Sequence, residues 1–128
     1  MYRILVVDDD EAANRAIAFM LKTEHFEVVE AHDGAQAMAV LRSQPIDLVL
    51  CDIFMPVSDG FETIGNVRRK FPDIPVVAMS GGGALGVFDV LPVARRLGAH
   101  ETLEKPLSME KLIAVITQLL GKNTRGNG

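Results

Sequence analysis

The chain has 128 residues, of which 48% are hydrophobic and 23% charged, and its formal net charge is −4 at pH 7. This length fits one domain of ordinary size, and the composition excludes a disordered or fibrous protein. The acidic balance and the scattered basic residues argue against direct nucleic-acid binding. No apolar stretch reaches the roughly 18 residues of a membrane span, and the N-terminus lacks a signal-peptide layout, so we expect no membrane insertion and a cytoplasmic location.

Short apolar runs alternate with helical patterns along the chain. The runs predict five strands, at residues 3–7, 26–31, 46–51, 76–79 and 102–104. Apolar residues at helical spacing follow each strand and predict five helices, in the segments 10–21, 37–44, 61–71, 87–97 and 108–121. The alternation predicts a doubly wound α/β domain with a parallel sheet, because right-handed crossovers place helices on both of its faces.

The start of the fourth helix is open in the sequence. Pro92 falls inside the helical pattern, so the helix begins either near Val87 or near Leu91, where Pro92 would lie in the first turn. Gly98 is expected to end it, because glycine readily adopts a left-handed cap conformation.

The last helix is expected to begin after Ser108 as its N-cap and to end at Gly121. The residues beyond it are polar and rich in glycine. We therefore expect a domain over residues 1–121 and a flexible C-terminal tail over residues 122–128.

Reactive side chains stand where four of the predicted strands end. Asp8 and Asp9 follow the first strand, Asp52 the third, Ser80 the fourth and Lys105 the fifth. Ligands of parallel α/β sheets bind at the carboxyl ends of the strands, so we expect these groups to converge. Three carboxylates repel one another unless a cation lies between them. Oxygen donors without a nearby histidine or cysteine favour Mg²⁺.

The charges of this set suit phosphoryl transfer. Those of the three aspartates, a Mg²⁺ ion and Lys105 cancel, so an incoming phosphoryl donor meets no net repulsion. A carboxylate that accepts a phosphoryl group gains negative charge, which Mg²⁺, Lys105 and a hydroxyl group can hold. Ser80 can supply that hydroxyl. Asp10, in contrast, is interpreted as an acid that stabilises the start of a helix.

In this order the residues resemble the receiver domain of bacterial two-component response regulators, over essentially the whole chain. Val6–Asp9 resembles the acidic pair of the family, and Leu48–Pro56 resembles its phosphoacceptor strand and the following loop. Ser80 and Lys105–Pro106 resemble its hydroxyl and its lysine. The resemblance implies a flavodoxin-like fold, with a five-stranded parallel sheet of order 2-1-3-4-5 and five helices.

The resemblance also implies a role for each residue of the metal site. Asp52 would accept a phosphoryl group from the phosphohistidine of a sensor histidine kinase or a histidine phosphotransfer protein. Asp9, Asp52 and the backbone carbonyl of Phe54 would ligate Mg²⁺, and Asp8 would act mostly through a metal-bound water.

The remaining roles concern the signal. Lys105 would contact the phosphoryl group and Ser80 would donate a hydrogen bond to it. The protein would be a signalling switch and not an enzyme, although it would promote its own phosphorylation and slow dephosphorylation. It would pass the signal to a protein effector through the face around the fourth helix, the fifth strand and the fifth helix.

Three departures from the family pattern bear on this mechanism. Thr102 stands where the family often has an aromatic ring that rotates inward, so we expect switching to depend on rearrangement of residues 81–97. Phe54 and Gly82 replace polar groups that orient water in members with fast hydrolysis, which predicts a long-lived phosphoryl form that Phe54→Asn should shorten. The segment between Ser80 and Lys105 is a few residues longer than usual.

Other interpretations remain open. The chain could be the receiver portion of a longer transcriptional regulator. A Mg²⁺-dependent phosphatase with an aspartyl nucleophile needs a second aspartate where Phe54 stands, and an FMN carrier needs a phosphate-binding loop where the chain is acidic. Cys51 is expected to be a buried, inert thiol. The three histidines share no metal-ligand spacing and are expected on the surface or in loops: His25, His32 and His100.

Overall fold

Strands and helices alternate along the chain, as the sequence predicts. The structure, a computed structural model, describes residues 1–53, 60–81 and 87–124. In these residues the elements are β1 (Arg3–Val7), α1 (Glu11–Thr23), β2 (Glu27–Ala31), α2 (Gly34–Ser43), β3 (Leu48–Asp52), α3 (Gly60–Lys70), β4 (Val76–Gly81), α4 (Val87–Arg96), β5 (Glu101–Lys105) and α5 (Met109–Thr124).

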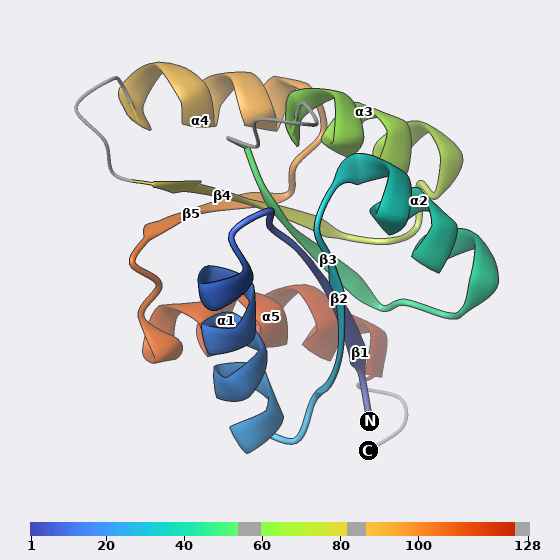
Figure 1. Cartoon of the computed structure of the whole chain (residues 1–128), viewed down its shortest axis with the longest axis vertical. Coiled ribbons are helices and arrows are strands. Elements are labelled where there is room, and N and C mark those ends of the chain that lie inside the picture. The colour runs from blue at the N-terminus through green and yellow to red at the C-terminus, as the bar shows by residue number, and fades with distance from the viewer. Residues whose placement is uncertain (54–59, 82–86, 125–128) are drawn as a thin grey trace.

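The strands form one sheet of order β2-β1-β3-β4-β5, and every pairing is parallel. The predicted fold class and strand order are therefore confirmed. The helices α2, α3 and α4 cover one face of the sheet, and α1 and α5 cover the other (Figure 1). The order reverses between β1 and β3, and all strand ends that carry reactive residues lie on the same edge of the sheet.

The core consists of two apolar layers, one on each face of the sheet. Successive side chains of a strand point to opposite faces, so Leu5 and Val7 belong to one layer while Ile4 and Val6 belong to the other. All four are fully buried. Because both faces are covered, the central strands are apolar throughout and end abruptly in polar residues at the site.

Three strands extend further than the sequence predicts. Asp52, Ser80 and Lys105 lie within β3, β4 and β5 and do not follow them. Parallel neighbours continue the pairing at these positions, since Asp52 pairs with Met79 and Ser80 pairs with Glu104. These three side chains therefore project from regular, paired backbone, which holds them more rigidly than loops would.

The fourth helix begins at Val87, so a start near Leu91 is wrong. Pro92 lies inside the helix and cannot donate a hydrogen bond to the preceding turn. Gly98 has φ +116° and follows the helix, as predicted. Its N–H donates to Arg95 O, and the next N–H, of Ala99, donates to the carbonyl of Ala94, which together make a Schellman cap.

The last helix also differs from the prediction. Ser108 is its N-cap, because its hydroxyl accepts a hydrogen bond from Lys111 N, but the helix continues past Gly121 to Thr124. A glycine does not end a helix by itself, and three more residues stay helical here. The predicted tail beyond residue 124 lies outside the described residues, as do Phe54 and Gly82. No helix in the described part of the chain is long and apolar enough to cross a membrane.

Candidate functional site

The site begins at the end of β1, where Asp8 is fully buried. Its backbone N–H donates to Ala31 O of β2 at 3.0 Å, which continues the β1–β2 pairing by one residue. Its carboxylate Oδ1 accepts from Asp10 N, also at 3.0 Å. Asp10 itself caps α1, because its carboxylate accepts hydrogen bonds from Ala12 N and Ala13 N. This confirms the interpretation of Asp10 as a helix-start acid.

Lys105 brings a positive charge to two of the carboxylates. Its Nζ lies 2.5 Å from Asp8 Oδ2 and 3.6 Å from Asp52 Oδ2. The Asp52 side chain is only 7% exposed and that of Lys105 is 21% exposed, so these charges interact with little screening by solvent. The Lys105–Pro106 peptide bond is cis. The ion pairs join β3 and β5 to Asp8, the residue that follows β1, and these three segments are far apart in the sequence.

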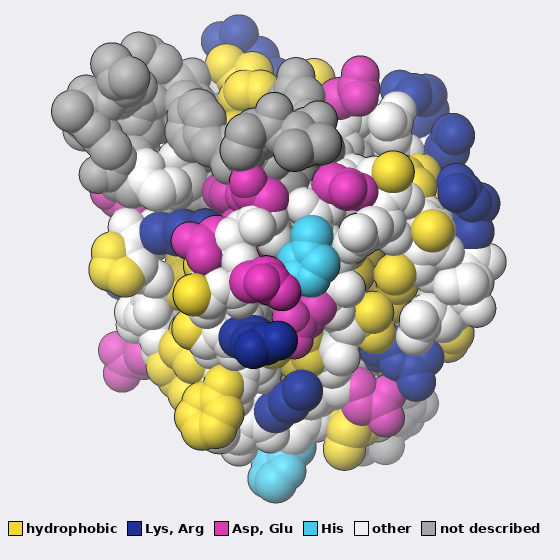
Figure 2. All heavy atoms as spheres, in the orientation of Figure 1, with side chains coloured by type: hydrophobic (Ala, Val, Ile, Leu, Met, Phe, Trp, Pro, Cys, Tyr) yellow, Lys and Arg dark blue, Asp and Glu magenta, His cyan; other side chains and the backbone are white. Residues whose placement is uncertain are grey.

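The three predicted carboxylates meet in space. One oxygen from each of Asp8, Asp9 and Asp52 lies within 4.8 Å of the others. Figure 2 shows acidic side chains gathered over the end of β1 and the start of α1, on the face turned to the viewer. A set of carboxylate oxygens from which histidine and cysteine ligands are missing fits a hard divalent cation such as Mg²⁺. The acidic residues present thus suit the metal that the sequence predicts.

Ser80 is fully buried in β4, the strand between β3 and β5. It stands one residue beyond Met79, the partner of Asp52, so its position along the sheet matches the edge where the carboxylates meet. Its Oγ lies 3.4 Å from Gly81 O, a long and weak hydrogen bond that leaves the hydroxyl easy to redirect. The geometry therefore places Ser80 at the edge where its predicted role requires it.

Cys51 precedes Asp52 in β3 and is fully buried. Burial raises the pKa of its thiol far above the ordinary value, and the negative charges of Asp52 and Asp8 raise it further. The thiol therefore stays protonated and unreactive, as the sequence predicts.

Gly60 supports the site in a way that the sequence interpretation missed. A β-carbon at this position would collide with the carbonyl oxygen of Asp52 and with the backbone of Ile53. The start of α3 therefore packs directly on the end of β3, which only glycine permits. In the sequence, the Asp-Gly pair at positions 59 and 60 indicates only a turn. No sequence pattern distinguishes a glycine that is needed for close packing from a glycine that is needed for a turn.

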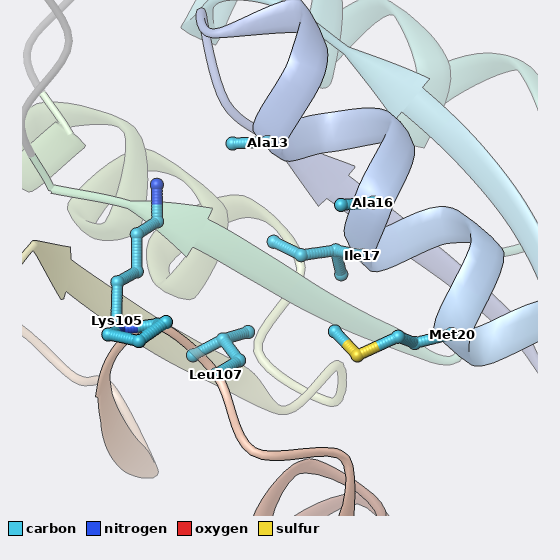
Figure 3. A pocket seen from close by; sticks show the side chains of 7 residues that line it. Ala13, Ala16, Ile17, Met20, Lys105 and Leu107 are labelled. Atoms are coloured by element: carbon cyan, nitrogen blue, oxygen red, sulfur yellow. The ribbon is translucent and has the colours of Figure 1, made fainter.

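An apolar cleft of about 510 Å³ lies beside the acidic cluster. It runs between α1 and the segment that follows β5, and the side chain of Lys105 rises along one side of it (Figure 3). The small side chains of Ala13 and Ala16 leave the cleft open on the α1 side. The remaining lining is apolar, from Ile17, Met20, Pro106 and Leu107.

Comparison with known proteins identifies the class to which this site belongs. Residues 4–117 match the family model of the response regulator receiver domain. The chain therefore belongs to the receiver domains of response regulators. Such domains are signalling switches of two-component systems, in which phosphorylation, Mg²⁺ and interaction with histidine kinases are general features of the family.

Individual relatives agree with this assignment. The chain is 32% identical to a putative NtrX-like response regulator of Rickettsia conorii, over 90% of this chain and 24% of the relative. It is 37% identical to the transcriptional regulatory protein ZraR of Klebsiella oxytoca, over 91% of this chain and 26% of the relative. The chain thus spans about a quarter of the length of these curated relatives.

A solved structure supports the fold over nearly its whole length. The receiver domain of NtrX from Brucella abortus is 32% identical to this chain and superposes with a TM-score of 0.86. The match covers 92% of this chain and 98% of that domain. The likeness extends over most of the chain and is not limited to the acidic edge of the sheet.

Proposed function

We propose that this chain is a phosphoacceptor receiver in which Asp52 takes a phosphoryl group from a phosphohistidine. The observation that carries the proposal is the environment of Asp52. Its buried carboxylate lies 3.6 Å from the ammonium group of Lys105 and within 4.8 Å of oxygens from both Asp8 and Asp9. A phosphoryl acceptor, a site for a cation and a positive charge thus lie close together, as phosphoryl transfer requires.

In the transfer, a carboxylate oxygen of Asp52 attacks phosphorus. A new P–O bond forms, the P–N bond to the donor histidine breaks, and its electron pair returns to the imidazole nitrogen. Asp9 and Asp52 would hold a Mg²⁺ ion, with Asp8 acting mostly through a water, and the ion would supply positive charge for the phosphoryl oxygens. Lys105 would move its contact from Asp8 toward the new phosphoryl oxygens, and Ser80 would donate a hydrogen bond to them.

The donor histidine has to reach a buried carboxylate, which requires close docking of the donor protein. The apolar cleft beside Lys105 supports a docking place on α1 and on the segment after β5, because it adjoins the acidic cluster and offers apolar area. We propose that a sensor kinase or a histidine phosphotransfer protein inserts an apolar side chain there while its phosphohistidine faces Asp52.

The experiment is phosphotransfer to Ala16→Arg. Ala16 is exposed and lines the cleft, so an arginine there should obstruct a protein donor. The protein donor is a phosphorylated histidine phosphotransfer domain that phosphorylates the native chain. The rate of phosphoryl transfer from this donor to Ala16→Arg should be about tenfold lower or more, which is the effect of losing a docking hot spot. The rate from acetyl phosphate should stay unchanged, because a small donor does not dock on α1.

Ala35→Arg is the matched control, since Ala35 is also an exposed alanine but lies on α2. It should leave both rates unchanged. Equal rates for Ala16→Arg and the native chain with the protein donor would contradict docking in the cleft. Failure of acetyl phosphate to phosphorylate any of these chains would instead remove the proposed acceptor role of Asp52.

The finer properties of the switch are also proposals. We place the effector surface on α4, β5 and α5, where Thr102 lines a second cleft of about 280 Å³. Slow dephosphorylation, a cytoplasmic location and a domain boundary that follows α5, beyond the expected residue 121, are further parts of the proposal. A receiver that acts alone is the first choice, and the greater length of the relatives supports the alternative of a receiver within a longer transcriptional regulator.

A further inference from the structure

A buried asparagine lies behind the acidic pair. Asn14 is in α1 and is fully buried. Its Nδ2 lies 3.0 Å from Ala31 O, 3.1 Å from Asp8 O and 3.3 Å from Val6 O. Only the NH₂ end of the amide can donate to carbonyl groups, so these three contacts fix which way the side chain faces. Its Oδ1 has no hydrogen-bond partner among the described residues.

The contact with the Asp8 carbonyl bears directly on Asp9. The carbonyl of Asp8 and the N–H of Asp9 belong to one planar peptide group, so a bond that fixes the carbonyl also fixes the orientation of that plane. The plane in turn determines where the Asp9 side chain leaves the backbone. Asn14 N donates to Asp10 O at 2.9 Å, so two bonds from one residue enclose the turn that carries Asp9.

The turn needs such support because the strand pairing ends there. Val7 is the last residue of β1, and the backbone N–H of Asp8 makes the final bond to β2. Beyond it, the carbonyl of Asp8 depends on side-chain donors, which are Asn14 and, at 3.4 Å, the His32 ring. A leucine of similar size would fill the space but would leave buried carbonyl groups without these donors.

We propose that Asn14 is a positioning residue for the Mg²⁺ site, which acts by orienting the Asp8–Asp9 peptide so that the Asp9 carboxylate faces Asp52. The inference rests on the Mg²⁺ site of the proposed function. Partners that orient metal ligands typically contribute about 10–100-fold to metal affinity. A residue that only stabilised the junction of β1, β2 and α1 would change stability and leave the affinity of the folded chain unaltered.

The test is an NMR titration with Mg²⁺ alone, followed on the backbone amides of the acidic edge, for the native chain and for Asn14→Ala. Asn14→Ala should remain folded and bind Mg²⁺ about tenfold more weakly. Asn14→Ser keeps one hydroxyl donor, so its Mg²⁺ affinity should lie between that of the native chain and that of Asn14→Ala. Leu21→Ala is the matched control, because Leu21 is a fully buried residue of the same helix that makes no side-chain hydrogen bond. It should lose stability in urea but keep the native Mg²⁺ affinity.

The outcomes separate the two proposals. An Asn14→Ala chain that is less stable but binds Mg²⁺ as the native chain does would overturn the positioning role and leave the metal site intact. A native chain that does not bind Mg²⁺ would overturn both. If neither Asn14→Ala nor Asn14→Ser folds, the side-chain NH₂ signals of Asn14 in the native chain provide the test. These signals should shift during the Mg²⁺ titration with the same dissociation constant as the backbone amide of Asp9. No shift at saturating Mg²⁺ would contradict the inference.

Discussion

Lys105 places one ammonium group between two buried carboxylates from different strands. It is 2.5 Å from Asp8, which is fully buried, and 3.6 Å from Asp52. In the absence of metal, these contacts offset the repulsion between the Asp8 and Asp52 carboxylates, because both are buried and water screens their charges little. The same group has to be available to a phosphoryl group, so its contribution to stability and its proposed function in signalling depend on the same contacts.

Lys105→Met should therefore destabilise the metal-free chain by about 3 kcal/mol, because it leaves a buried charge without its partner. The loss should be smaller at saturating Mg²⁺, since the cation then supplies the missing positive charge. Urea unfolding with and without Mg²⁺ measures both values. Lys111→Met removes an exposed lysine of α5 and should change little in either condition. An effect of Lys105→Met that is independent of Mg²⁺ would contradict this account of the site.

His100 gives the fold a pH dependence that is separate from the site. Partial burial and the nearby positive charge of Arg68 lower the pKa of its imidazole. Its Nδ1 accepts a hydrogen bond from Val76 N at 3.1 Å, which requires an unprotonated nitrogen. The folded state binds this proton less readily than the unfolded state does, so stability falls as the pH drops from about 6.5 through the lowered pKa.

His100→Gln should remove part of this loss, because glutamine can accept the same hydrogen bond but does not titrate. We expect a smaller difference in unfolding free energy between about pH 7 and about pH 5.5 than the native chain shows. An identical pH profile for His100→Gln and the native chain would rule out His100 as the source.

At the scale of elements, two helices end in the same cap with different residues. Gly98 follows α4 with φ +116°, and His25 follows α1 with φ 68°. After α1, His25 N donates to Lys22 O and the next N–H, of Phe26, donates to Leu21 O. The glycine was predictable from the sequence. The cap at His25 was not, because a side chain in the left-handed region is uncommon and other contacts have to stabilise it.

The two caps predict opposite effects of substitution. Gly98→Ala should destabilise the fold by about 2 kcal/mol, because alanine is strained at positive φ and its β-carbon would meet the Arg68 side chain. His25→Gly should stabilise it by about 0.5–1 kcal/mol, because glycine relieves the strain and loses part of the gain through its larger chain entropy. Chemical unfolding of both variants measures this. Effects of the same sign would contradict the assigned caps.

At the scale of the molecule, much of the fold was predictable from the sequence. Apolar runs and helical periodicity predicted all ten elements, and the order of reactive residues predicted which strand ends meet. The ends of elements were less predictable, as Asp52 and Lys105 show, because pairing with a neighbouring strand continues past the apolar run. The roles of Asn14 and Gly60 could not be predicted from the sequence, because both depend on tertiary contacts with backbone groups. Asn14 contacts three backbone carbonyls, and Gly60 packs against the backbone at the end of β3.

The whole-molecule response to phosphorylation should be concentrated around α4. Thr102 cannot act as a rotating aromatic ring, so we expect movement of residues 87–97 to carry the signal from Ser80. Hydrogen exchange with a beryllium fluoride complex as phosphoryl mimic should show altered protection there. Asp52→Ala with the same mimic is the control and should show no alteration. An unchanged α4 in the native chain would contradict this route.

Asp52 is proposed to accept a phosphoryl group with the help of Mg²⁺. Intact-mass measurement after incubation with phosphoramidate or acetyl phosphate tests it most directly. The native chain should gain the mass of one phosphoryl group with Mg²⁺ and gain little when a chelator is present, whereas Asp52→Ala should gain none in either case. No mass gain in the native chain, or an equal gain in Asp52→Ala, would contradict the account.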